Sequence, residues 1–336
     1  MNALVDRYGR VHRDLRISLT DRCSLRCTYC MPAEGVPWLS SATILTTDEL
    51  VRLTRIAVSL GAREVRLTGG EPLLRPDVVD VVAGLAQVDT PDGPLDLSLT
   101  TNALRLPALA APLRDAGLQR VNISLDTLQR TRFMELTRRD RLAQTLAGIE
   151  AARAVGFAPI KLNALIMRGV NEDEIADLVT FAVERGMHMR FIEHMPLDAG
   201  HTWRREEMVT GDEILASVAA RFALSPRGDQ GSSPAQEWDV IEAATGSAPV
   251  TVGIIASVTR AFCERCDRVR LTADGQFRNC LFAREESDLR SLLREGADDE
   301  RIAAAMIASV SRKQAGHGID GPGFVQPARP MSAIGG

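Results

Sequence analysis

Residues 23–30 read CSLRCTYC and place three cysteines in one short loop. Cys23, Cys27 and Cys30 follow a C-x3-C-x2-C spacing, with no histidine or fourth cysteine close by. A four-iron cluster takes one thiolate per iron, so three thiolates leave one iron able to bind another ligand. A zinc site and a disulfide loop are the alternatives, although structural zinc usually takes four protein ligands. The loop therefore favours an iron–sulfur cluster with one open position.

The other three cysteines form a second incomplete set. Cys263 and Cys266 have C-x2-C spacing, and Cys280 follows thirteen residues later, again without a fourth cysteine. A zinc ribbon is the alternative, but that motif normally needs a second C-x2-C pair. In a reducing compartment, cysteines grouped in this way favour metal or cluster ligation over disulfides. The sequence thus predicts a second centre with an open position.

Composition places the chain among ordinary soluble globular proteins. Its 336 residues are 45% hydrophobic, and 40 Lys and Arg against 44 Asp and Glu give a net charge of −4. This balance does not indicate generic nucleic-acid binding. Residues 1–11 contain no apolar run, and no stretch is long and apolar enough for a membrane span. We expect a cytoplasmic protein that binds neither nucleic acid nor membranes.

Short apolar segments alternate with longer amphipathic ones, which predicts an α/β fold with a parallel sheet wrapped in helices. The expected strands span residues 15–20, 65–68, 97–101, 121–125, 160–166 and 188–193. The expected helices span residues 47–60, 77–86, 107–116, 141–154 and 172–185. Thr46 and Glu49 have the spacing of a capping box, and Asn171 is the expected N-cap of the last helix. Six strands make most of a barrel. Residues 227–236 are expected to form a flexible surface loop.

Polar and small residues follow several of these strands. They include residues 69–72 (GGEP), Thr100 to Asn102, Ser124 to Asp126, and residues 193–196. Since the carboxyl ends of parallel strands gather on one rim of a barrel, these residues are predicted to face one site. Taken alone, GGEP is more often a strand-to-helix turn than a ligand site.

Basic residues form another pattern within the strands. Arg268 and Arg270 share one face of a strand, because residues two apart point the same way. Arg16 precedes the first cysteine loop, Arg66 precedes GGEP, and Lys161 lies in the fifth strand. Inward-facing cations need an anion, and guanidinium groups suit phosphate oxygens. Solvated charges at strand edges are the alternative. The histidines without ligand-like spacing, expected on the surface or in packing positions, are His194, His201 and His317.

These motifs together resemble a known family. The first cysteine loop with Tyr29, followed by GGEP, resembles the radical S-adenosylmethionine (SAM) enzymes. The second cysteine set, residues 268–270 (RVR) and a tail running from residue 324 (FVQP) to the terminal Gly-Gly are similar to the GTP 3′,8-cyclases of molybdenum cofactor biosynthesis. The resemblance runs from about residue 16 to residue 336. It implies a partial (β/α)6 TIM-like barrel of the radical SAM type over residues 1–226. A C-terminal extension, residues 227–336, carries the second cluster and the tail.

The resemblance also implies a reaction. The first of two [4Fe-4S] clusters would bind SAM through its open iron and cleave it reductively. The 5′-deoxyadenosyl radical would take the 3′ hydrogen of the GTP ribose, and the ribose radical would attack guanine C8. The product would be (8S)-3′,8-cyclo-7,8-dihydroguanosine 5′-triphosphate. Enzymes that catalyse this reaction are classed as lyases. The second cluster would hold the guanine edge, so that the radical meets its target first.

Individual residues carry over from the family pattern. The residues that match positions around SAM are Tyr29, Gly70, Ser124 and Met195; the missing Cβ of Gly70 would let the backbone approach the ligand. The residues that match positions around GTP are Arg16, Arg66, Thr100, Lys161, Arg268, Val269 and Arg270. Those expected to act in catalysis are Gly335 and Gly336, which would reach into the barrel, and Arg16. Ala103 stands where the family usually has glycine, which puts the local backbone geometry in doubt.

The implied partners are a flavodoxin- or ferredoxin-type electron donor and a downstream cyclic pyranopterin monophosphate synthase. The sequence leaves the oligomeric state open, a homodimer included. Two other functions compete: a radical SAM enzyme that matures a peptide, and a non-catalytic iron–sulfur or zinc module that senses redox state or docks a partner. The first usually carries more than three cysteines in its extension. The second has no use for GGEP or for a glycine terminus.

Overall fold

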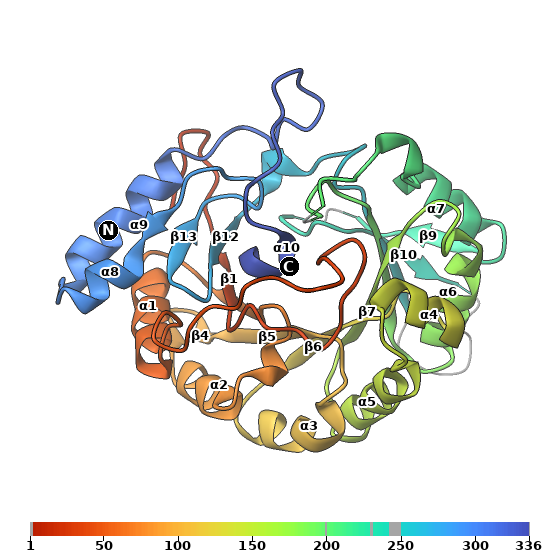
Figure 1. The fold of residues 1–336 in the computed structure, drawn as a ribbon, viewed down its shortest axis with the longest axis horizontal. Coiled ribbons are helices and arrows are strands. Elements are labelled where there is room, and N and C mark those ends of the chain that lie inside the picture. The colour runs from red at the N-terminus through yellow and green to blue at the C-terminus, as the bar shows by residue number, and fades with distance from the viewer. Residues whose placement is uncertain (1–2, 199, 229–230, 242–249, 336) are drawn as a thin grey trace.

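Parallel strands line the inside of a ring of helices in the computed structural model, which describes residues 3–198, 200–228, 231–241 and 250–335 (Figure 1). The parallel strands are β1 (Asp14–Ser18), β2 (Glu64–Thr68), β5 (Asp96–Thr101), β6 (Arg120–Ser124), β7 (Ile160–Ile166), β8 (His188–Glu193), β11 (Thr251–Ile255) and β12 (Arg268–Leu271). The antiparallel strands are β9 (Leu224–Pro226), β10 (Gln236–Val240), β13 (Gln276–Arg278) and β14 (Ser287–Asp288). Their order in the sheet is β14-β13-β12-β1-β2-β5-β6-β7-β8-β11-β10-β9. A separate hairpin pairs β3 (Asp89–Thr90) with β4 (Gly93–Pro94).

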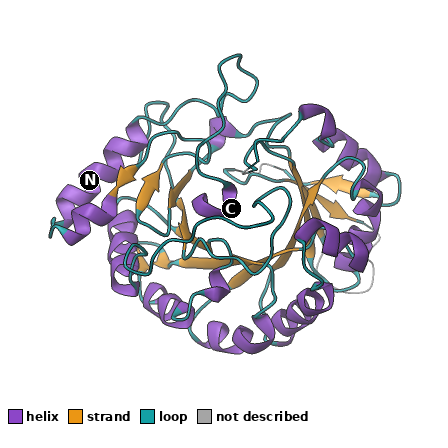
Figure 2. Cartoon of the chain, in the orientation of Figure 1, coloured by secondary structure: helices purple, strands orange, loops and turns teal. Residues whose placement is uncertain are grey.

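Helices cover the outer face of this sheet (Figure 2). Those around the ring are α1 (Thr47–Ser59), α2 (Val78–Ala86), α3 (Leu106–Asp115), α4 (Arg130–Thr137), α5 (Leu142–Ala154), α6 (Ile175–Val183) and α7 (Gly211–Ala219). The C-terminal part adds α8 (Leu289–Arg294), α9 (Asp299–Ser311) and the short α10 (Met331–Ile334). Figure 1 shows α10 in the centre of the ring, beside the loop that follows β1. Within the described residues, no helix is both long and apolar enough to cross a bilayer.

The strand alternation explains why the ring has a polar interior. In β2, Val65 and Leu67 are fully buried in the hydrophobic core, whereas Arg66 between them is only partly buried. In β7, Leu162 and Ala164 belong to the same core, and the alternate residue Lys161 does not. Because alternate residues point to opposite faces, the apolar set packs under the helices and the polar set faces the inside of the ring.

The sequence predictions for this part of the fold are confirmed. Each predicted strand end lies within two residues of the observed end, and the predicted helices correspond to α1, α2, α3, α5 and α6. The capping box of α1 is present: Glu49 N donates to Thr46 Oγ1 at 3.2 Å, and Thr46 N donates to the Glu49 carboxylate at 2.7 Å. The extension adds β11 and β12 to the two sides of the six predicted parallel strands.

Two local predictions are correct only in part. Asn171 occupies the N-cap position of a 3-10 helix, Glu172–Glu174, that leads into α6, but its side chain makes no capping bond. Its Nδ2 donates instead to the carbonyls of Asp126 and Leu165, each at 2.8 Å. The loop at residues 227–236 is not simply a surface loop, although residues 229 and 230 lie outside the described part. Ala235 is fully buried, and the Ser232 carbonyl accepts a hydrogen bond of 2.6 Å from Arg268.

Candidate active site

The first cysteine loop faces a cavity at the carboxyl ends of the strands. This first cavity has a volume of about 240 Å³, and Cys23, Cys27 and Cys30 all line it. The four residues that match SAM positions in the family line the same cavity: Tyr29, Gly70, Ser124 and Met195. The structure therefore brings together the whole predicted SAM set, from four different segments of the chain.

A second cavity adjoins the first. Its volume is about 190 Å³, and Cys263, Cys266 and Cys280 line it. The predicted GTP residues on its wall are Arg16, Arg66, Thr100, Arg268 and Arg270. The residues that line both cavities are Thr100, Asn163, Ile192, Met195 and Met331. The two cavities thus share a wall, and a ligand in one lies next to a ligand in the other.

Neither cysteine set is arranged as a site for a single metal ion. A tetrahedral zinc site holds its sulfurs about 3.8 Å apart, given Zn–S bonds of about 2.3 Å. In the described part of the chain, no three His, Cys, Asp or Glu side chains converge tightly enough to hold one ion. All six cysteines are free, so neither set forms a disulfide. Three thiols around one cavity fit a larger inorganic centre with one iron per thiolate.

The thiols of the first set are hard to ionise without a metal. Burial raises the pKa of Cys23 to about 11 and that of Cys30 to about 12. Burial, followed by the negative charge of Asp126, raises the pKa of Cys27 well above its ordinary value. Glu71 adds a further negative charge that raises the pKa of Cys23. A cluster would therefore supply the positive charge that these thiolates lack.

Glu71 of the GGEP motif braces the rim between β2 and β5. Its carboxylate accepts hydrogen bonds from Leu73 N at 3.0 Å, Thr101 Oγ1 at 2.7 Å and Asn102 N at 2.8 Å. Burial raises the pKa of Glu71 to about 7. Asn102, held in this way, donates from Nδ2 to Ser24 Oγ in the cysteine loop at 3.2 Å. The motif thus ties the cysteine loop to two neighbouring strands.

The two glycines of this motif are required by the protein itself. A Cβ on Gly70 would lie 2.4 Å from the carbonyl oxygen of Arg22 and 2.6 Å from that of Asp21. A Cβ on Gly69, whose φ is +155°, would lie 2.6 Å from Thr20 O. Hydrogen bonds hold this approach, since Gly70 N donates to Thr20 O at 2.7 Å. The expected reason for Gly70 was close approach to a ligand; Gly70 lines the first cavity, and the structure adds a second reason, its close approach to the residues that lead into the cysteine loop.

Tyr29 and Ala103 also have observed local roles. The Tyr29 hydroxyl donates to Asp126 Oδ2 at 2.6 Å, and Asp126 Oδ1 accepts from Leu165 N at 2.9 Å, which fixes the cysteine loop to β7. Ala103 has a φ of +67°, in the left-handed region that favours glycine. The family's usual glycine therefore has a conformational reason, and the alanine of this chain adopts the same backbone.

Positive charge dominates the second cavity. The buried Nε atoms of Arg16, Arg66 and Arg268 have no hydrogen-bond partner among the residues that the structure describes. Asp14 lies 3.6 Å from Arg16 Nε and 3.5 Å from Arg268 Nε, and it is one carboxylate among several guanidinium groups. Burial, and then the charge of neighbouring arginines, lowers the pKa of Arg16 to about 9. Arginines placed in this way favour an anionic ligand.

Two predicted GTP residues lie away from this wall. Lys161 lies near the amino end of β7, paired in register with Asn122 and His188, and lines neither cavity. Burial, and then the charge of Arg190, lowers the pKa of Lys161 to about 8. Val269 is buried in the hydrophobic core, so only its backbone is available toward the cavity side.

The C-terminal tail reaches the wall between the cavities. The Gly335 carbonyl accepts a hydrogen bond of 2.6 Å from Arg270 Nη1. Gly335 has a φ of +90°, and a Cβ there would lie 2.6 Å from Thr68 Oγ1. Ser332 lies against Cys30 and lines the first cavity. Gly336 lies outside the described residues. The tail therefore contacts a cysteine of one set and an arginine beside the other.

Several site residues were missed by sequence reasoning. His194 lines the first cavity and His317 lines the second, whereas both were expected at surface or packing positions. His317 does also pack, with Nε2 2.9 Å from Ser257 O and its ring against Phe282. Arg190, at alternation spacing in β8, completes the arginine set and pairs with Glu237 at 3.0 Å. The alternation that singled out Arg268 and Arg270 could have found Arg190.

Comparison with known proteins identifies the family. Residues 17–182 match the radical SAM superfamily, and residues 187–319 match the family described as Molybdenum Cofactor Synthesis C. A GTP 3′,8-cyclase of Streptomyces coelicolor is 55% identical over 338 residues, which cover 100% of this chain and 97% of that protein. The chain belongs to the GTP 3′,8-cyclase family. A GTP 3′,8-cyclase of Corynebacterium glutamicum is 52% identical over 336 residues, covering 99% of this chain and 89% of that protein.

Solved structures agree on the fold of this GTP 3′,8-cyclase family member. Streptococcus suis SuiB bound to S-adenosylmethionine matches with a TM-score of 0.63, covering 89% of this chain and 69% of that one. At 14% identity, this likeness concerns the fold alone. As a radical SAM enzyme, the chain takes an iron–sulfur cluster and SAM.

Proposed function

We propose that this chain converts GTP to (8S)-3′,8-cyclo-7,8-dihydroguanosine 5′-triphosphate, the first step of molybdenum cofactor biosynthesis. The reaction joins ribose C3′ to guanine C8, so the 3′ hydrogen must be removed while the base is held still. The observation that carries the proposal is the pair of adjoining cavities, each lined by three free thiols. A radical formed in the first cavity would therefore lie beside GTP bound in the second.

The first cavity is the SAM site in this proposal. Cys23, Cys27 and Cys30 would hold a [4Fe-4S] cluster, which with SAM would supply the radical that removes the 3′ hydrogen. Tyr29, Gly70, Ser124 and Met195 line the cavity around SAM. The brace from Glu71 and the bond from Tyr29 to Asp126 keep the loop in place, which fixes the position from which the radical starts.

The second cavity holds GTP and a second [4Fe-4S] cluster on Cys263, Cys266 and Cys280. We assign the guanine edge to this cluster and the triphosphate to the arginines. The Nε atoms of Arg16, Arg66 and Arg268 make no hydrogen bond to a described residue, and triphosphate oxygens can supply charge-assisted ones. Arg270 and the backbone of Val269 belong to the same strand. Lys161 enters this scheme only through its positive charge, since it does not line the cavity.

The tail completes the site between the two ligands. Arg270 holds the Gly335 carbonyl, and Thr68 and Ser18 lie where a side chain on Gly335 would be. We assign Gly335 and Gly336, with Arg16, to positioning the groups that lose or receive the 3′ hydrogen. A tail without side chains leaves room for the ribose while excluding water.

The wider setting follows the same proposal. Residues 1–226 form the barrel that binds SAM, and residues 227–336 carry the second cluster and the tail. A flavodoxin- or ferredoxin-type protein supplies electrons, and a cyclic pyranopterin monophosphate synthase takes the product, in the cytoplasm. Each of these assignments depends on GTP being the substrate.

Anaerobic reconstitution tests the proposal. We expect about eight irons per chain, four for each cluster. With SAM, a reductant and GTP, the protein should form 5′-deoxyadenosine and the cyclised nucleotide, separated by liquid chromatography. Cys27→Ala should abolish both products. Cys266→Ala should retain some 5′-deoxyadenosine and form no cyclised nucleotide.

The two variants also define the contradicting results. Zinc as the sole bound metal after anaerobic iron loading would falsify the cluster assignment. Equal loss of both products in Cys266→Ala would remove the separate role of the second cavity. A peptide-maturing enzyme would consume SAM without any response to GTP.

A further inference from the structure

A short N-terminal segment, residues 4–12, reaches the second cysteine set. We call it the N-terminal strap. Its backbone folds back on itself, with Val5 bridged to Val11 and His12 N donating to Leu4 O at 2.8 Å. Asp6 Oδ1 accepts from Tyr8 N at 2.9 Å and from Arg10 N at 3.0 Å, so the turn is fixed before it meets the rest of the chain.

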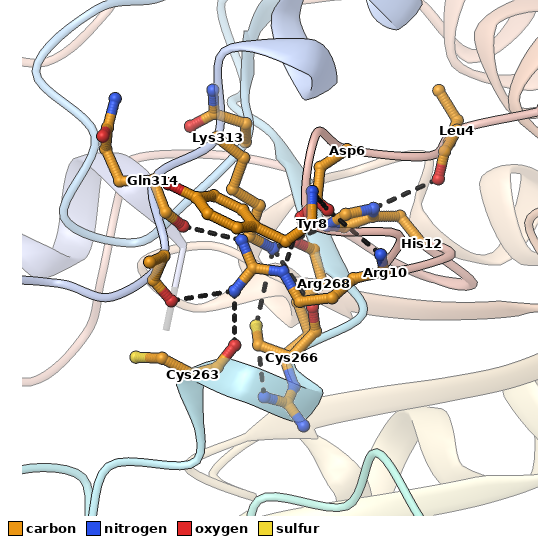
Figure 3. A network of polar contacts seen from close by, with 12 residues as sticks. Leu4, Asp6, Tyr8, Arg10, His12, Cys263, Cys266, Arg268, Lys313 and Gln314 are labelled. Atoms are coloured by element: carbon orange, nitrogen blue, oxygen red, sulfur yellow. Dashed lines mark hydrogen bonds and ion pairs between the residues drawn. The ribbon is translucent and has the colours of Figure 1, made fainter.

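Arg10 joins the strap to the second cysteine set. Its guanidinium donates to the carbonyls of Cys263 at 2.5 Å, Gln314 at 2.6 Å and Ala315 at 2.9 Å. Its Nε donates to Asp6 at 2.5 Å, which orients the fork. Figure 3 shows these contacts together with those of Lys313 to Cys266. The strap thus connects one cluster cysteine to the segment that follows α9.

Lys313, in that segment, is buried under the strap with 2% of its surface exposed. Its Nζ lies 2.8 Å from His12 Nε2, 2.8 Å from the Arg268 carbonyl and 3.5 Å from Cys266 Sγ, with Cys266 O at 3.4 Å. His12 Nδ1 lies 3.1 Å from the Leu4 carbonyl, which can only accept, so Nδ1 carries the ring proton. His12 Nε2 therefore accepts from Lys313.

The hydrogen bonds of Lys313 leave one charge to be balanced. A buried ammonium is costly unless an anion or a full set of acceptors compensates it. Asp6, the carboxylate 3.8 Å from His12 Nε2, already pairs with Arg10. Histidine and carbonyl acceptors are neutral. Cys266 is the contact of Lys313 that carries a negative charge when it ligates a cluster.

Composition makes the choice of lysine informative. Of the 40 basic residues in this chain, only Lys161 and Lys313 are lysines, and the rest are arginines. An ammonium is a compact charge with three donors, whereas a guanidinium is a flat fork that needs more room. The three directions around Lys313 Nζ, toward His12, Arg268 and Cys266, suit the ammonium. Lys313 is thus one of only two positions at which this chain has lysine in place of arginine.

We propose that Lys313, oriented by His12 of the N-terminal strap, is a positioning residue of the second cluster: its ammonium donates to the Cys266 thiolate and raises the reduction potential of that cluster. This inference rests on the proposed second cluster. A donated hydrogen bond and a positive charge both stabilise the more negative, reduced state. The same ammonium holds the carbonyl of Arg268, so the cluster and an arginine assigned to GTP share one anchor.

The test isolates the second cluster in the full-length chain. Cys23, Cys27 and Cys30 are replaced by alanine, and the reconstituted protein should hold about four irons. Redox titration followed by electron paramagnetic resonance then compares this parent with added Lys313→Met, His12→Gln and Arg312→Met. Arg312 is the matched control: an adjacent, half-exposed cation 3.7 Å from Glu285. We expect Lys313→Met to shift the reduction equilibrium at least tenfold toward the oxidised cluster, about 59 mV for one electron.

His12→Gln should shift the equilibrium in the same direction by less, because the amide oxygen still accepts from Lys313, and Arg312→Met should leave it unchanged. An intact cluster with an unmoved potential in Lys313→Met overturns the proposal. If Lys313→Met fails to hold iron, His12→Gln decides, and an unmoved potential there is equally contradictory. A parent that binds no iron contradicts the proposed second cluster itself, which separates the two failures.

A direct readout uses the rarity of lysine. In a chain carrying Lys161→Arg and grown with lysine labelled with ¹⁵N at Nζ, Lys313 is the one labelled side chain. Pulsed electron paramagnetic resonance of the reduced second cluster should show ¹⁵N coupling, and Lys313→Met should abolish it. Absence of the coupling in the labelled parent overturns the proposal, since a lysine with a merely structural role leaves no such signal.

Discussion

The two cysteine sets differ in the charges that surround them. The first set lies near the carboxyl groups of Glu71 and Asp126, and the pKa values of all three of its thiols are raised. In the second set, burial opposes ionisation of Cys266, but the positive charges of Lys313 and Arg268 outweigh it and lower the pKa of that thiol. A centre in acidic surroundings gives up an electron more readily, and one in basic surroundings keeps it. The surroundings therefore fit electron donation to SAM at the first site and binding of an anionic nucleotide at the second.

The largest expected effect breaks the first site alone. Gly70→Ala places a Cβ 2.4 Å from the Arg22 carbonyl, so the cysteine loop cannot dock on the rim. We expect bound iron to fall from about eight to about four per chain and SAM cleavage to be lost. Iron analysis and 5′-deoxyadenosine formation measure this. Gly228→Ala is the control, because no described residue lies within 4 Å of its added Cβ. Full iron and normal cleavage in Gly70→Ala would refute the steric account.

A second substitution should weaken ligand binding only in the second cavity, where the arginines lie. Arg66→Ala removes a guanidinium whose buried Nε makes no hydrogen bond to any described residue. GTP affinity should fall by about 1.5–3 kcal/mol, roughly tenfold to 150-fold, as for a hydrogen bond to a charged group. Stability of the ligand-free protein should be unchanged or slightly higher, because repulsion among the arginines decreases. Calorimetric titrations with GTP and with SAM separate the two sites, and a loss of SAM affinity equal to that of GTP contradicts the division.

A third change tests the tail between the two sites. Gly335→Ala combines a φ of +90° with a Cβ 2.6 Å from Thr68 Oγ1. The strain, roughly 1–2 kcal/mol, should reduce cyclised product per 5′-deoxyadenosine about fivefold to thirtyfold and leave iron content unchanged. Gly323→Ala is the control, since its added Cβ meets nothing within 4 Å. Chains that end at Ile334 or run one residue past Gly336 extend the series. Equal yields from all of them would show that the tail has no role.

A smaller expected effect is a pH dependence of stability that arises from His12 in the N-terminal strap. Burial, and then the charge of Lys313, lowers the pKa of His12 from 6.5 to about 4. The unfolded chain therefore takes up this proton first as pH falls, and the stability contributed by neutral His12 is present above pH 6.5 and lost toward pH 4. Between pH 7 and pH 5, the free energy of unfolding of the iron-free protein should fall by about 1–2 kcal/mol more than that of the iron-free His12→Gln variant. Urea unfolding at both pH values measures this, and parallel losses would contradict it.

The smallest effect concerns the rim of the first site. Ala103→Gly relieves a left-handed backbone, at some cost in the entropy of the unfolded chain. We expect the free energy of unfolding to rise by about 0.5–1 kcal/mol, with both cysteine sets unaffected. Thermal unfolding of the iron-free protein is the measurement. A decrease in stability would show that the methyl group contributes packing that outweighs the strain.

Sequence patterns predicted the parts of the molecule that depend on neighbours in the chain. The first cysteine loop spans eight residues and the strands have regular alternation, so both could be recognised directly. The surroundings of the second cysteine set could not be predicted from the sequence, because His12 and Lys313 are separated by 301 residues and come into contact only in the folded protein. Asn171 shows the opposite case: instead of making a local capping bond, its side chain donates to the carbonyls of Asp126, 45 residues away, and Leu165, 6 residues away. Side-chain contacts between segments that are far apart in the sequence could not be predicted.

The pairing of β1 with β12 also affects how the protein is made. Asp14 to Ile17 pair with Arg268 to Leu271, strands separated by about 250 residues of chain. At roughly 5–20 residues per second, β12 leaves the ribosome some 10–50 s after β1. During that interval β1 presents an unpaired edge, a known starting point for aggregation. Barrel closure is therefore a late event in the life of the nascent chain, because it must wait for the strand that the second cysteine set flanks.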